Sequence, residues 1–116
     1  MIVVVQGAKT FKDYSVFMSG MRSALINLAD EDKQFTVFSA GPVNINNMAM
    51  EFINVTERSL KAKGIKSKLV KIPQGWIDQN YKDIDLLAYY ALPKEEIPDM
   101  ISRVSNKGVN VQFYRF

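Results

Sequence analysis

The feature that most constrains the fold is a run of four consecutive β-branched residues at positions 2–5, followed by Gln6 and Gly7. β-branched side chains favour strands. Because no polar residue alternates with the apolar ones, both faces of this strand are expected to be buried. A strand buried on both faces is typical of the centre of a parallel sheet with helices on each side.

The rest of the chain alternates between helix-like and strand-like segments. Apolar residues at three- and four-residue spacing predict three helices, at residues 13–29 with Asp13 as the cap, from about Asn44 to Gly64, and from about Ile97 to Asn106. Short apolar or alternating runs predict strands at residues 35–38, 66–72, 84–90 and 109–113. Residues 73–83 are predicted to be irregular.

The order of these segments predicts an α/β fold: a three-layer, Rossmann-like open parallel sheet of about five strands, with helices on both faces. Strands 2–5 and 84–90 are the most apolar, whereas 66–72 and 109–113 mix polar and apolar residues. A strand order of 3-2-1-4-5 places the first pair at the centre and the second pair at the edges. The length of 116 residues predicts a single domain spanning residues 1–116.

Two absences narrow the chemistry. The chain has no histidine and no cysteine, which excludes Ser-His-Asp and Cys-His nucleophilic catalysis and most zinc sites. We therefore predict no metal site and no cofactor. The apolar run at the start is too short for a signal peptide or a membrane span, so we expect a cytoplasmic protein with no membrane partner.

The charge is mildly basic, +3 with an isoelectric point near 9.2, which favours anionic ligands. Five lysines lie within residues 61–71. We interpret them as a solvated helix end and an edge strand, where lysine discourages pairing between sheet edges. Aromatic residues are not interleaved with these lysines, so single-stranded nucleic acid ranks last among the expected partners.

Ligands of open α/β sheets bind at the carboxyl ends of the strands, where the strand order reverses. Here that point lies between the first and fourth strands. The predicted ligand-binding residues at this edge are Gly7, Lys9, Thr10, Ser39, Gly41, Asn44, Trp76 and Tyr89.

Each of these residues has a proposed role and a structural alternative. Gly7 lets a ligand approach the backbone or makes a tight strand exit, while Lys9 and Thr10 supply a charge and a donor. The helix beginning near Asn44 directs free N–H groups at an anion, although residues 39–47 are also typical of turns and caps. Trp76 or Tyr89 stacks on a base or covers the core. No GxGxxG or P-loop motif is present.

Residues 38–49, Phe-Ser-Ala-Gly-Pro-Val-Asn-Ile-Asn-Asn-Met-Ala, follow the segment 2–9 by one predicted helix. Together they resemble the SLOG superfamily of Rossmann-like nucleotide-binding domains, in particular its small phage- and bacteria-borne branch. Segments 72–76 and 83–89 are also similar to that branch. The resemblance implies a pocket for a nucleotide or a nucleotide-derived signal, with Gly7, Lys9, Ser39 and Gly41 at the matching positions. It also implies the host cytoplasm as the location if the gene belongs to a phage.

The chain departs from the family pattern at several positions. Pro42 replaces the second glycine of a double-glycine turn, Asn44 a later glycine, and Asn46 an acidic residue. The PGGxGTxxE element of the hydrolase members is absent. These departures weigh against catalysis, so the leading hypothesis is non-catalytic binding of a nucleotide-like small molecule.

Two alternatives stay open besides the binding of nucleic acid. In the first, the chain is a protein-interaction module with a vestigial pocket, and a host or partner protein binds its surface. In the second, it is a nucleotide N-glycosidic hydrolase, for which the candidate acids and bases are Glu51, Asp85, Glu95 and Glu96. Assembly into a homo-oligomer is compatible with each of these hypotheses.

Overall fold

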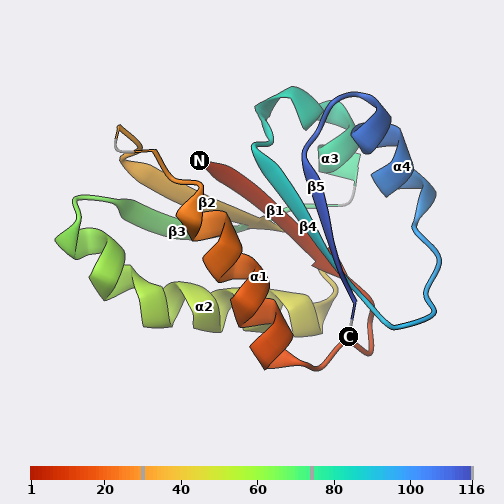
Figure 1. Ribbon diagram of the computed structural model, residues 1–116, viewed down its shortest axis with the longest axis horizontal. Coiled ribbons are helices and arrows are strands. Elements are labelled where there is room, and N and C mark those ends of the chain that lie inside the picture. Colours follow the sequence, from red (N-terminus) through yellow and green to blue (C-terminus); the bar gives the residue numbers. More distant parts are fainter. Residues whose placement is uncertain (30, 74, 116) are drawn as a thin grey trace.

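The computed structural model describes residues 1–29, 31–73 and 75–115. Its centre is a parallel sheet of five strands in the order β3-β2-β1-β4-β5 (Figure 1). The strands are β1 (Ile2–Gly7), β2 (Gln34–Ser39), β3 (Lys66–Lys71), β4 (Leu86–Ala91) and β5 (Val111–Arg115). The predicted strand order, 3-2-1-4-5, is confirmed.

Helices cover both faces of the sheet, as predicted, so the fold has three layers (Figure 1). The helices are α1 (Tyr14–Ile26), α2 (Val43–Ala62), α3 (Gly75–Gln79) and α4 (Asp99–Asn106). α1 and α2 bury their apolar residues against one face, and α3 and α4 against the other. The prediction of an irregular stretch between β3 and β4 is wrong in part, since α3 and a 3-10 turn at Tyr81–Asp83 lie there.

Burial follows the alternation of side chains along each strand. In β1, Val3 and Val5 join the apolar cluster under α1 and α2, whereas Val4 joins the cluster under α3 and α4. All six residues of β4 are buried, whereas β3 and β5 keep exposed residues. The run without alternation at positions 2–5 therefore reports a central strand.

Most helix ends lie close to their predicted positions. The Asp13 carboxylate accepts a hydrogen bond from the Val16 amide at 3.0 Å and caps α1. Gly64, with φ of +76°, follows α2 in the left-handed conformation expected after a helix. α4 begins at Asp99 rather than at about Ile97, because Pro98 keeps the residue before it extended. β5 begins later than predicted because the Val109 amide closes the end of α4 by donating to the Val104 carbonyl.

Candidate functional site

The loops that follow β1, β2 and β4 leave the carboxyl edge of the sheet side by side. The Ala8 amide donates to the Tyr90 carbonyl at 3.0 Å, and the Ala40 amide donates to the Val5 carbonyl at 2.9 Å. The start of α2 and the loop before α1 lie at this same edge, at the lower right of Figure 1. This is the position where an open α/β sheet reverses its strand order and binds ligands.

Asn44, the second residue of α2, holds the loop between β1 and α1. Its side-chain amide donates to the Ala8 carbonyl at 3.0 Å and to the Phe11 carbonyl at 2.7 Å. These two carbonyls flank Lys9 and Thr10, both of which are exposed. The Asn44 amide thus secures Lys9 and Thr10 next to the first turn of α2.

The first turn of α2 has free backbone donors. No side chain caps it at Pro42, and the first amide of the turn with an acceptor is Asn46, which donates to the Pro42 carbonyl at 3.0 Å. Among the described residues, the amides of Val43, Asn44 and Ile45 have no acceptor. A helix of 20 residues carries partial positive charge at this end. The turn is open to solvent at Val43, which is 71% exposed, whereas Ile45 is fully buried.

Gly41 precedes this turn with φ of +85°, a conformation that favours glycine. A Cβ atom built on Gly41 would meet no other atom within 4 Å. Gly41 therefore supplies both the turn into α2 and free space beside it.

Gly7 and Ser39 lie beneath this surface. A Cβ atom on Gly7 would lie 2.7 Å from Ile45 Cδ1 and 2.7 Å from the Tyr90 carbonyl oxygen, so protein atoms already occupy the space beside Gly7. Ser39 is 1% exposed, and its hydroxyl donates to the side-chain oxygen of Asn46. Both residues hold α2 against the sheet.

Tyr89 and Trp76 lie on the other face of the sheet, in the apolar cluster with α3 and α4. Tyr89 is 4% exposed, its ring stacks on Phe113 with centroids 5.2 Å apart, and its hydroxyl donates to Glu95 at 2.9 Å. Burial, and then Glu95, raise the pKa of the Tyr89 phenol above its ordinary value. Trp76 packs on Phe38 with centroids 4.7 Å apart and stays partly exposed.

The loop between β4 and α4 is held by two residues that the sequence analysis did not place in this role. Arg115 donates from Nη1 to the carbonyls of Leu92, Pro93 and Glu95 at 3.2, 3.1 and 2.9 Å. The Glu95 carboxylate accepts from Tyr89 and from the Leu92 amide. An open hollow of about 590 Å³ lies along residues 92–95. Arg115 is at least 20 positions from its partners, so no local sequence signal identifies this contact.

Gln6 is a further residue that sequence reasoning did not single out as a ligand-binding residue. It lies opposite Tyr89 in the register of β1 and β4 and is 7% exposed. Its buried side-chain oxygen has no hydrogen-bond partner among the described residues. Buried amides normally have hydrogen-bond partners. A glutamine in an otherwise apolar strand is therefore the sequence feature that could have identified Gln6.

The carboxylates proposed for hydrolysis do not lie together at one site. Asp85 precedes β4 and accepts a hydrogen bond from the Ile2 amide at 2.7 Å, which places it at the amino edge of the sheet. Glu95 and Glu96 follow β4 at the carboxyl edge, and Glu51 is exposed on α2. In the described part of the chain, no three acidic side chains lie close enough to hold a metal ion.

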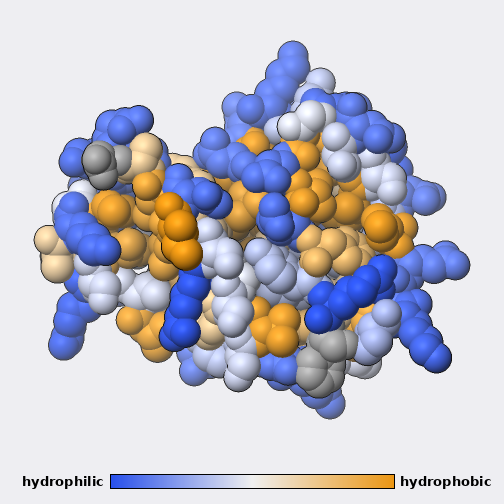
Figure 2. All heavy atoms as spheres, in the orientation of Figure 1, coloured by the Kyte–Doolittle hydropathy of each residue, from blue (hydrophilic) through white to orange (hydrophobic). Residues whose placement is uncertain are grey.

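Another hollow of about 590 Å³ lies at the amino edge, between the last turns of α1 and α2. Leu25, Leu28, Leu60 and Ile65 contribute its apolar lining. Figure 2 shows apolar atoms gathered around the last turns of α1, where Ile26 is 82% exposed. The structure therefore has hollows at both edges of the sheet.

No model of a known protein family matches the chain, and no curated protein matches it either. No helix within residues 1–29, 31–73 and 75–115 is long and apolar enough to cross a membrane. The fold defines an α/β protein of the Rossmann-like class, and the resemblance to the SLOG superfamily stays a prediction from the sequence.

Proposed function

We propose that the chain binds a phosphorylated, nucleotide-like small molecule at the carboxyl edge of its sheet without transforming it. One observation carries this proposal: Asn44 holds the exposed Lys9 and Thr10 against the uncapped first turn of α2. A lysine, a hydroxyl and free helix amides together form a favourable environment for a phosphate group.

The ligand would lie across the start of α2. Its phosphate accepts hydrogen bonds from the amides of Val43 and Asn44 and faces the Lys9 ammonium group. Its base extends over Gly41, where space is free, toward the partly exposed Trp76. Tyr89 has no role in this arrangement, because Phe113 and Glu95 occupy its ring and its hydroxyl.

The separation of the acidic side chains supports binding rather than hydrolysis. General acid–base catalysis needs a proton donor or acceptor within hydrogen-bond reach of the reacting group. Asp85 lies at the opposite edge from the proposed phosphate site, and the Glu95 carboxylate is engaged by Tyr89 and Leu92.

Trp76 is the single tryptophan of the chain, so its fluorescence can report binding directly. We expect nucleoside monophosphates, cyclic dinucleotides or ADP-ribose to change this fluorescence and raise the melting temperature, and unphosphorylated nucleosides to do neither. Lys9→Ala should weaken binding by about tenfold, the loss of one charge-assisted contact.

Lys94→Ala is the matched control, because Lys94 is exposed at the same edge but lies on the loop after β4. It should leave the affinity unchanged. The proposal is wrong if no phosphorylated compound at about millimolar concentration changes either signal, or if the two variants weaken binding equally.

A second candidate function is binding of a protein partner, which the hollow and the exposed Ile26 at the amino edge favour. Native mass spectrometry of the chain isolated from its own cells would distinguish the two functions. One stoichiometric protein without a retained nucleotide supports this second function, whereas a retained nucleotide without a protein supports the first.

A further inference from the structure

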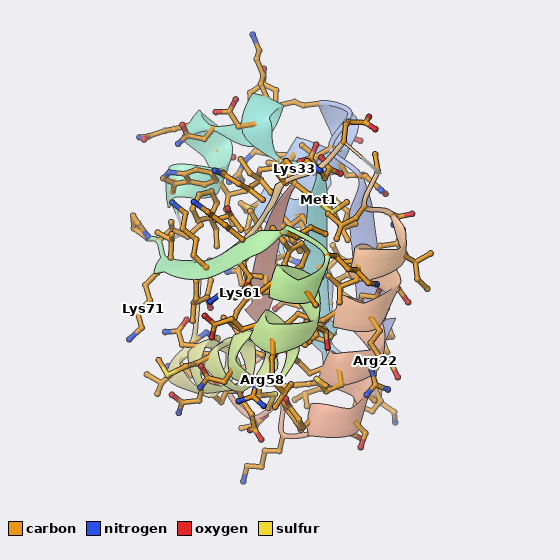
Figure 3. The ribbon with its side chains drawn as sticks, turned by 90° about the vertical axis from the view of Figure 1, so that its left-hand side faces the viewer. Met1, Arg22, Lys33, Arg58, Lys61 and Lys71 are labelled. Carbon is orange, nitrogen blue, oxygen red and sulfur yellow. The ribbon has the colours of Figure 1, made fainter. Side chains whose placement is uncertain are left out.

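Positive charge is concentrated in one segment of the chain. Residues 58–71 contain one arginine and five lysines and no acidic residue, which gives this segment a charge of +6. The whole chain carries +3, so the remaining residues together carry −3. Figure 3 shows Arg58, Lys61 and Lys71 on one side of the molecule. Among residues 1–29, 31–73 and 75–115 the ion pair is Arg103 with Asp78, so no carboxylate of these residues lies within 4.0 Å of the cations.

The segment includes β3, an edge strand that pairs only with β2 in the described sheet. In Figure 3, β3 lies in the foreground with no element in front of it. The Lys66 amide donates to the carbonyl of Lys33, just before β2, and the Ile72 amide donates to that of Ser39 in β2, at 2.9 Å each, so both point inward. Because main-chain groups alternate in direction along a strand, the N–H and C=O groups of Ser67, Leu69 and Lys71 point to the free edge.

Hollows lie on both faces of the start of β3. One of about 390 Å³ lies toward α2 and is lined in part by Lys61, Ile65 and one acidic residue, Glu57. The other, of about 280 Å³, lies on the opposite face beside Gln34 and Lys68. Lys66 and Ser67 line both. A strand added beside β3 would project alternate side chains toward the two hollows.

We propose that the free edge of β3 is a docking site for an extended, acidic segment of a partner protein, which pairs with β3 as a sixth strand. Carboxylates on one face of that segment would face Lys66 and Lys68, which share a face of β3, and opposite charges across neighbouring strands stabilise their pairing. The same lysines disfavour pairing between two copies of β3, because like charges would meet. The charge pattern thus selects a partner and disfavours self-association at this edge.

A peptide strand fits this edge better than nucleic acid does. The edge presents carbonyl acceptors as well as amide donors, and phosphate groups at neutral pH can pair only with the donors. Base stacking needs exposed aromatic rings. Neither β3 nor the end of α2 before it contains an aromatic residue. An extended peptide satisfies donors and acceptors alike.

A fluorescent peptide of about seven alternating glutamate and valine residues, long enough to span β3, tests the proposal. We expect fluorescence anisotropy to show binding, and the affinity to fall as salt rises from about 0.01 M to about 0.1 M. Hydrogen exchange at the Leu69 and Lys71 amides should slow in the complex. A peptide with lysine in place of glutamate should not bind. A glutamate peptide that is N-methylated at every residue should bind at least about tenfold less tightly, because it has no amide donors.

Charge reversal in the protein gives the matched comparison. Lys66→Glu combined with Lys68→Glu should abolish binding of the glutamate peptide and create binding of the lysine peptide. Lys12→Glu combined with Lys94→Glu makes the same change in net charge at the carboxyl edge and should leave glutamate-peptide binding unchanged. Thermal melting of both variants checks that they fold.

The proposal is overturned if the N-methylated peptide binds as well as the unmodified one, or if the Leu69 and Lys71 amides gain no protection. It is also overturned if a short DNA duplex binds this side more tightly than the glutamate peptide and displaces it, which would identify a phosphate-binding surface. These outcomes are independent of ligand binding at Lys9 and the start of α2.

Discussion

Gly20 in α1 packs closely against side chains of β4 and β5. A Cβ atom at this position would lie 2.5 Å from the Tyr90 hydroxyl and 3.1 Å from ring atoms of Tyr114. Tyr90 is fully buried, and its hydroxyl donates to the Phe17 carbonyl at 3.2 Å. Glycine inside a helix costs about 1 kcal/mol relative to alanine, so here close packing outweighs helix propensity.

We predict that Gly20→Ala lowers the free energy of unfolding by about 1–3 kcal/mol, the usual cost of overpacking. Tyr90→Phe removes the hydroxyl that blocks the new methyl group. In the double variant the two effects should therefore not add, with a favourable coupling of about 1 kcal/mol. Urea denaturation of the four proteins measures this coupling.

Tyr114→Phe is the control for this cycle, because it keeps the ring atoms that lie near Gly20. It should not offset the loss caused by Gly20→Ala. Strict additivity of Gly20→Ala and Tyr90→Phe would show that the Tyr90 hydroxyl is not the obstacle.

Single residues also show where sequence reasoning stops at the candidate site. The strand order places Lys9, Thr10, Gly41 and Asn44 at one edge, and the structure brings these four together. The sequence does not show that Ile45 fills the space beside Gly7. Whether such a glycine faces a ligand or a side chain depends on contacts between residues far apart in the chain.

At the scale of elements, α3 is a helix that depends on contacts with the rest of the fold. A helix of five residues is too short to be stable alone. It is held by the buried Ile77, by Trp76 on Phe38, and by an ion pair in which Arg103 of α4 contacts Asp78 at 2.9 Å. Contacts of this kind leave no periodic pattern, which explains why the sequence predicts an irregular segment here.

Asp78→Asn should weaken the connection between α3 and α4 in a pH-dependent way. The hydrogen bond from Arg103 lowers the pKa of the Asp78 carboxyl, so the folded state favours the ionised form. This contribution to stability is present above the ordinary Asp pKa of about 3.9 and is lost as the pH falls through the lowered value. We expect Asp78→Asn to melt slightly below the wild type at neutral pH, with the difference vanishing in acid.

Melting curves of the two proteins from neutral to strongly acidic pH test this expectation. Asp83→Asn is the control, because the Asp83 side chain makes no hydrogen bond or ion pair with the described residues. A difference between Asp78→Asn and the wild type that is constant across the pH range would contradict the assigned role of the carboxylate.

The longer elements are predictable because their patterns are local. The unbroken apolar run of β1 and the three- and four-residue spacing of α1 and α2 identify central strand and covering helices. Their ends shift where a cap decides, as at Pro98 before α4 and at Val109, which closes α4 rather than starting β5. Periodicity gives the type of an element, and capping contacts set its limits.

At the scale of the whole molecule, the fold places basic groups from distant parts of the sequence on one side. Arg22 from α1, Lys33 from the loop before β2 and the amino terminus at Met1 lie on the same side as Arg58 and Lys61 of α2 (Figure 3). These groups come from distant parts of the sequence, so the folded chain brings together like charges that are farther apart in the unfolded chain. We expect the resulting repulsion to destabilise the folded state.

We predict that salt stabilises the unliganded protein, because screening shortens the range of this repulsion from about 30 Å at 0.01 M to about 10 Å at 0.1 M salt. Lys63→Glu combined with Lys66→Glu should raise the melting temperature at low salt and reduce its rise with added salt. Lys12→Glu combined with Lys94→Glu makes an equal change in net charge at the other end of the sheet and should do neither. Melting curves across a sodium chloride series distinguish the variants. If both pairs respond alike, net charge rather than its position governs stability, and the concentration of cations around β3 has no energetic consequence for the folded chain.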